Sequence, residues 1–131
     1  MCDPVRLAEA MADRIQPLLP GSLRATPNGE RVELGNPRTW AIFDCGVFLA
    51  MDPGGVEEPL LFAAERFLDR VQDFVSEELT MPWPARPDQA HQSQLPRRWV
   101  EIRGAALRLG FGDASSPMVE LEPIPLEAIR S

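Results

Sequence analysis

The sequence predicts an α+β domain in which helices pack against an antiparallel sheet of about five strands. Residues 56–81 carry apolar side chains at steps of three and four, which is the spacing of a helix with one apolar face. Residues 22–50 and 97–122 alternate apolar and polar side chains between turn residues, as strands do. With 131 residues, of which 44% are hydrophobic, the chain is expected to form one domain, residues 1–131, with its own core.

A first helix is predicted to begin at the N-terminus. Asp3 is a good capping residue, and Pro4 suits the first helical position, where its missing N–H costs nothing. The apolar face of this helix is formed by Leu7, Met11 and Ile15. The Pro20-Gly21 pair ends it, and a helix this short has to dock on the rest of the chain.

Three strands are predicted to follow the first helix. Residues 22–34 indicate a hairpin, because the turn sequence Pro27-Asn28-Gly29 separates two alternating segments. Residues 39–50 then form the strand richest in large apolar side chains. Both of its faces are apolar, which is typical of a central strand covered on both sides, and Gly46 indicates a bulge or bend in it.

The helix in residues 56–81 is the longest predicted element. Pro59 suits its first turn, and Pro82 predicts an end near Leu79 or Thr80. Two interpretations of its wide apolar face stay open: the whole face is core, or part of it contacts a second subunit. The residues that would form such a partner contact are Phe67, Leu68, Val71, Phe74 and Val75.

A proline-rich segment, residues 82–97, follows this helix and is expected to be a flexible loop that is either functional or disordered. Strands are predicted at residues 97–112 and 117–122. The alternation changes parity within the first of these, which predicts a bulge near Gly104-Ala105. Residues 123–131 have room for one helical turn after Pro125.

The resulting order, α-β-β-β-α-β-β-(α), together with small size and acidity, is similar to that of the type III secretion chaperones and their relatives. The resemblance rests on element order and on no sequence motif. It implies a non-enzymatic protein, usually a homodimer, that binds a partner or client protein. It also implies that the long helix contributes to the dimer, and that apolar patches on the sheet and first helix hold an extended client segment.

Composition limits the possible partners and the compartment. The net charge is −7, which argues against binding to nucleic acid or to an anionic membrane surface. All 13 basic residues are arginine, a bias that indicates a GC-rich bacterium. The start of the chain lacks the pattern of a signal peptide, so we expect a cytoplasmic protein whose cysteines, Cys2 and Cys45, stay reduced.

No catalytic, cofactor or metal site is predicted. The single histidine, His91, lies in the proline-rich loop, and Cys45 lies in a predicted buried strand where cysteine behaves as a small hydrophobe. No zinc spacing, nucleophile motif or phosphate-binding loop is present. Asp44 interrupts an apolar strand, and it is therefore the carboxylate around which an alternative site of carboxylates and arginines could form.

Three tryptophans and one charged strand face are further candidates for contacts. Trp83, held between Pro82 and Pro84, would either bind a partner or fold back and close the core. Trp40 and Trp99 begin strands and are expected at the rim or in the core. Cross-strand ion pairs are predicted among Glu101, Arg103, Arg108, Glu120 and Glu122.

The sequence therefore favours an acidic, chaperone-like or regulatory adaptor that binds a protein partner without enzymatic activity. Two alternatives stay open. One is a small-ligand-binding protein or enzyme with a site near Asp44. The other is an immunity or inhibitor protein that uses its acidic surface against a basic toxin.

Overall fold

The computed structural model of the chain describes residues 2–36, 38–51, 58–85 and 95–130. Its helical elements are α1 (Pro4–Ile15), α2 (Cys45–Ala50), α3 (Pro59–Leu79) and the 3-10 turns η1 (Gln16–Leu18) and η2 (Leu126–Ala128). Its strands are β1 (Arg24–Asn28), β2 (Arg31–Gly35), β3 (Trp40–Asp44), β4 (Arg98–Arg103), β5 (Ala106–Asp113), β6 (Ser116–Glu120) and β7 (Ile124–Pro125). All strand pairs given for them are antiparallel, and the predicted α+β class is confirmed.

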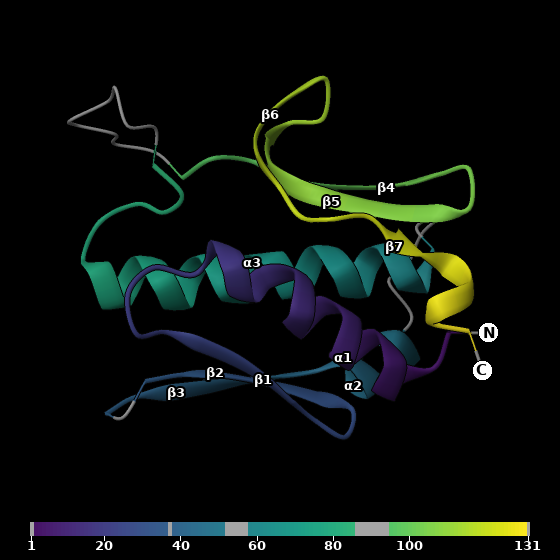
Figure 1. The fold of residues 1–131 in the computed structure, drawn as a ribbon, viewed down its shortest axis with the longest axis horizontal. Helices are drawn as coiled ribbons and strands as arrows, with labels where there is room; N and C mark the ends of the chain where they lie inside the picture. The colour runs from purple at the N-terminus through teal and green to yellow at the C-terminus, as the bar shows by residue number, and fades with distance from the viewer. Residues whose placement is uncertain (1, 37, 52–57, 86–94, 131) are drawn as a thin grey trace.

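The strands form two sheets, and the prediction of one sheet of about five strands is wrong. One sheet has the order β1-β2-β3, and the other has the order β4-β5-β6 with β7 also paired to β5. Helices α1 and α3 lie between the two sheets, so the molecule has three layers (Figure 1). Alternation along the chain identifies strands and their hairpin neighbours, but it carries no information on whether the third strand pairs with the fourth.

Helix α3 has the predicted bounds, and its wide apolar face is explained by the second sheet. The helix contacts β4 and β5 on one side and α2 and β3 on the other. Phe67 meets Phe43 of β3 edge to face, with ring centroids 5.4 Å apart. The five residues of this face named for a subunit contact are buried in the chain's own core, whereas Leu79 at the end of the helix is 37% exposed. A helix between two sheets has to be apolar on both sides.

The third predicted strand is only half as long as expected, because the chain changes to helix α2 at Cys45. The Asp44 side chain caps α2 by accepting a hydrogen bond from Val47 N at 3.2 Å. Phe48 of α2 then stacks on Phe43, with ring centroids 4.7 Å apart. Two predictions are thereby corrected: β3 is an edge strand rather than a central one, and Gly46 lies in the first turn of a helix rather than in a bulge.

The predicted bulge near Gly104-Ala105 is a two-residue turn instead. It joins β4 to β5, with Arg103 paired to Ala106, and Gly104 takes a φ of +63°. The change of parity in the sequence therefore marks a hairpin. The irregularity of this sheet lies further on, between Phe111 and Gly112.

Most of the remaining elements agree with prediction, but the short strand β7 in the C-terminal segment was not predicted. Asp3 caps α1 by accepting a hydrogen bond from Val5 N at 2.9 Å, and the first hairpin turns at Gly29, with a φ of +62°. The predicted C-terminal helical turn is η2. The two ends of the described chain meet, since Asp3 N donates to Ile129 O at 2.7 Å (Figure 1).

Candidate functional site

The six side chains predicted to contact a partner all lie in the core of the chain. Four have no exposed surface and two are 9% exposed. They are Phe67, Leu68, Val71, Phe74, Val75 and Trp83. A partner could reach them only by opening the core, so a binding surface on the folded monomer has to be sought elsewhere.

Trp83 closes the core beyond the end of α3, which is the second of its two predicted alternatives. Its indole packs edge to face against Phe111 of β5, with ring centroids 5.5 Å apart. Its backbone N–H donates to Ser76 Oγ of α3 at 3.0 Å. The rest of the proline-rich loop, residues 86–94 with His91, lies outside the described residues.

The environment of Asp44 is that of a helix cap. Besides capping α2, its carboxylate faces Arg31 of β2, with Nε and Oδ2 3.4 Å apart. The neighbouring Cys45 is fully buried, and burial together with the charge of Asp44 raises the pKa of its thiol to about 12. Because the thiolate is the nucleophile, Cys45 is inert at neutral pH.

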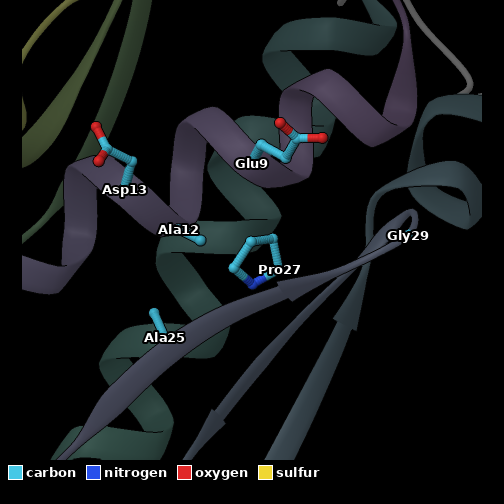
Figure 2. A pocket seen from close by; sticks show the side chains of 6 residues that line it. All are labelled: Glu9, Ala12, Asp13, Ala25, Pro27 and Gly29. Atoms are coloured by element: carbon cyan, nitrogen blue, oxygen red, sulfur yellow. The ribbon is translucent and has the colours of Figure 1, made fainter.

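A cleft of about 510 Å³ lies between α1 and β1 (Figure 2). The carboxylates of Glu9 and Asp13 lie on the helix side, and Ala25, Pro27 and Gly29 line the strand side. In Figure 2 both carboxylates point away from the ring of Pro27. The cleft thus offers acidic groups and small apolar side chains, but neither a nucleophile nor a proton-transferring pair.

The described ranges contain neither a metal-binding cluster nor a membrane-spanning helix. Within those ranges, no three His, Cys, Asp or Glu side chains are grouped so that they could hold a metal ion. The helices found there include none that is long and apolar enough to cross a membrane.

The predicted ion pairs form in part on the outer face of the four-stranded sheet: those of Arg108 are present, whereas the described chain shows none for Arg103 or Glu122. Arg108 of β5 binds Glu101 of β4, with Nη1 and Oε1 2.5 Å apart, and Glu120 of β6, with Nη2 and Oε1 2.8 Å apart. Its guanidinium also lies over the Trp99 ring, 5.3 Å from the centroid. Because Arg108 bridges carboxylates on both neighbouring strands, the cluster holds its own sheet together.

The outer face of the three-stranded sheet is different, since it carries the most exposed tryptophan. Trp40 is 68% exposed, more than any other large apolar side chain in the described part of the chain. Beside it lies a hollow of about 480 Å³. The side chains and backbone that line this hollow include Arg24, Thr26, Glu33, Gly35, Asn36 and Trp40. This Trp40 hollow combines one large apolar surface with hydrogen-bonding groups of both charges.

Sequence reasoning expected Trp40 at the rim or in the core and did not select it as a site. A usable signal was present, because Trp40 and Asp44 have the same parity in β3. Side chains two and four residues apart share one face of a strand, so the charged Asp44 indicates that Trp40 faces solvent. That signal was masked by the expectation that the strand continues to residue 50.

The chain was compared with known proteins, and no family model, curated protein or solved structure matches it. The likeness to type III secretion chaperones therefore stays a prediction from the order of elements.

Proposed function

We propose that this protein is a non-enzymatic adaptor that binds a partner protein through the Trp40 hollow. The observation that carries the proposal is that two exposed residues, Trp40 and Arg24, line the same hollow; Arg24 Nη1 also donates to Leu23 O at 3.0 Å. Tryptophan and arginine are the residue types that most often dominate binding energy at protein interfaces. The partner segment would place an apolar side chain against the indole and a carboxylate near Arg24.

Hydrogen bonds fix the described residues just before Trp40, which favours binding because little order has to be gained. Asn36 Oδ1 accepts hydrogen bonds from Arg38 N at 2.7 Å and Thr39 N at 2.9 Å. Asn36 Nδ2 donates to Glu78 of α3 at 3.0 Å, and the hydroxyl of Thr39 donates to the same carboxylate. The start of β3 is thereby fixed to the end of the long helix.

A chaperone-like or regulatory role in the cytoplasm agrees with this proposal. The two cysteines are unpaired in the structure, which supports a reducing compartment. A small-ligand or catalytic site around Asp44 has less support, because the Asp44 carboxylate is engaged as a helix cap and by Arg31. The immunity or inhibitor role is the remaining candidate, and its complex would weaken strongly with added salt.

The proposal is tested by capturing partners with the tagged protein from a lysate of its own source cells. Variants Trp40→Ser and Arg24→Glu should lose the captured partner while keeping the native circular dichroism spectrum. Val5→Ser is the matched control, because it removes another exposed apolar side chain, 38% exposed, from helix α1. A partner that both hollow variants retain, or the capture of no partner at all, would contradict the proposal.

A further inference from the structure

The backbone of β3 presents an unpaired edge, and the hairpin registers show which groups form it. Asn28 and Arg31 flank a two-residue turn, so they exchange both hydrogen bonds of their pair. Hydrogen-bonded and non-bonded pairs then alternate along the sheet. Val32 and Leu34 consequently direct their backbone groups toward β3, where they meet Phe43 and Ala41.

The other residues of β3 direct their backbone groups away from β2. Two printed bonds fit this alternation: Asn36 N donates to Thr39 O at 2.9 Å, and Cys45 N donates to Glu30 O at 2.8 Å. Trp40, Ile42 and Asp44 therefore form the free edge. Within the described chain, no hydrogen bond engages the outward N–H or C=O of Ile42.

The opposite edge of the same sheet, on β1, is closed. The side-chain amide of Gln16 donates to Leu23 O at 3.2 Å and accepts from Ala25 N at 2.7 Å, so it imitates a neighbouring strand. The next outward position is Pro27, which has no N–H to offer. Gln16 and Pro27 thus block the addition of another strand.

The described edges of the other sheet also carry residues that discourage pairing. Edge strand β4 contains Arg98, Glu101 and Arg103, and edge strand β6 contains Pro117. Charged residues and proline are the usual means by which natural sheets prevent edge-to-edge association. β3 has no proline, and its one charged residue, Asp44, lies at its end and is paired with Arg31 of β2.

We propose that the β3 edge pairs with β3 of a second copy of this chain, antiparallel and about a two-fold axis through Ile42. The outward residues are spaced evenly about Ile42, so the edge is complementary to itself. Each Ile42 N–H would donate to the Ile42 carbonyl of the second copy. Each Asp44 N–H would donate to the Trp40 carbonyl of the second copy, which gives four bonds across the seam by this pattern.

The side chains on the outer face fit the same arrangement. The two Ile42 side chains would lie opposite each other, and each Trp40 would lie opposite Asp44 of the second copy. Arg31 already pairs with Asp44, so the carboxylate at the seam is neutralised. The net charge of −7 opposes self-association in general, but no like charges face each other across this seam.

The inference concerns the edge of the sheet and does not depend on partner binding at its face. In the proposed dimer, the three-stranded sheets of the two copies join into one continuous sheet with both Trp40 hollows on the same surface. A partner with two suitable segments would then bind with the gain in avidity that linked sites give.

Sedimentation of the purified chain over a concentration series tests the seam. We expect the wild type to be a dimer and both Ile42→Arg and Ile42→Glu to be monomers, because like charges would meet at the axis. An equimolar mixture of the two variants should restore the dimer. Thr26→Arg is the matched control for Ile42→Arg. Thr26 pairs with Glu33, which pairs with Ile42, so the new charge lies on the same face of the sheet but on β1, away from the seam.

A wild type that stays monomeric at every concentration would overturn the inference, as would dimers that persist in both Ile42 variants or a mixture that stays monomeric. Hydrogen exchange of the wild type covers the case in which the variants misfold. The amides of Ile42 and Asp44 should become protected as concentration rises, whereas unchanged exchange at both amides would refute the seam. Arg24→Glu separates the two proposals, because it should lose the partner and keep the dimer.

Discussion

Trp40 and Trp99 occupy equivalent positions in the two sheets and have different surroundings. Each lies near the start of its strand, on the outer face, directly opposite a glycine: Gly35 for Trp40 and Gly110 for Trp99. Trp99 is half-buried, and its indole N–H is buried without a hydrogen-bond partner in the described chain. Trp40 is largely exposed.

A neighbouring arginine accounts for the difference. Arg108 covers the Trp99 ring and is itself held by Glu101 and Glu120, so that tryptophan is completed by its own sheet. No such cation covers the Trp40 ring within the described residues. A tryptophan opposite a glycine is therefore a structural element in one sheet and an available surface in the other. Whether such a tryptophan is part of the fold or is free to bind therefore depends on a covering side chain, such as Arg108, and not on the tryptophan–glycine pair itself.

The largest effect is expected when the two glycines are replaced. In Gly110→Ala the new Cβ would collide with the carbonyl oxygen of Val119 and lie 2.9 Å from Cζ2 of Trp99. We expect a loss of about 3 kcal/mol, the upper end for overpacking, because backbone has to move. In Gly35→Ala the nearest atom is Trp40 Cβ at 3.0 Å, and about 1 kcal/mol is expected. Urea unfolding of both variants measures the difference, and equal losses would contradict the comparison.

Removing the indoles should give the next largest effect. Trp99→Ala opens a gap above Gly110, and we expect a loss of about 2 kcal/mol, below the range for fully buried tryptophan because Trp99 is half-buried. Trp40→Ala should change the stability of the monomer by less than about 0.5 kcal/mol. Unfolding has to be measured at a concentration where the chain is monomeric. A large loss for Trp40→Ala there would show that its indole is part of the fold.

Arg108→Met should lower the stability of the fold by a smaller amount, because it uncovers Trp99 without removing the indole. The substitution removes the cation over the ring and leaves Glu101 and Glu120 as neighbouring like charges. The expected loss of stability is smaller than that of Trp99→Ala. The fluorescence of Trp99 should shift to longer wavelength as water reaches the ring, best observed in a Trp40→Phe background. Arg24→Met, which changes an arginine of the other sheet, should leave that spectrum unchanged.

The smallest effect on stability is expected at Glu65 of α3, which pairs with Arg98 of β4 on the inner face of the sheet. Burial acts to raise the pKa of Glu65, but hydrogen bonds from Arg66 and Arg98 outweigh it and hold this pKa below 4.5. Its stabilisation is therefore fully present above the unfolded-state value and is lost as pH falls through the folded-state value. Unfolding midpoints of wild type and Glu65→Gln should converge as the pH is lowered below 4.5. A gap that widens on acidification would contradict this sign.

Much of the fold could be read from local chemistry. Pro59 and Pro82 bracket α3, Asp3 and Pro4 start α1, and Gly29 turns the first hairpin, because each of these residues acts through its own backbone. The second sheet could not be predicted in this way. Whether β3 pairs with β4 depends on contacts across the whole chain. The wide apolar face of α3 fits a second sheet and a subunit contact equally well.

The candidate site was harder to predict than the fold. A run of apolar residues such as 40–50 fits a buried strand and a strand followed by a helix equally well, so Asp44 was read as an interruption instead of a cap. The prolines on either side of Trp83 suggest an exposed, stiff contact residue, but its side chain is buried. The parity of Trp40 with Asp44 indicates that Trp40 faces solvent, but the sequence does not show that no other side chain covers the indole.

The separation of the strands into two sheets has a consequence for how the chain folds. Every strand pair in the described residues joins neighbours along the chain, apart from β7 with β5. Each sheet can therefore form through short loop closures, which cost little entropy and favour rapid folding. The distant contacts that remain include the docking of the three-stranded sheet on α1, the docking of the four-stranded sheet on α3, and the bridge between Cys2 and Arg130. The slow step of folding is thus expected to be the closing of the two sheets over the helices.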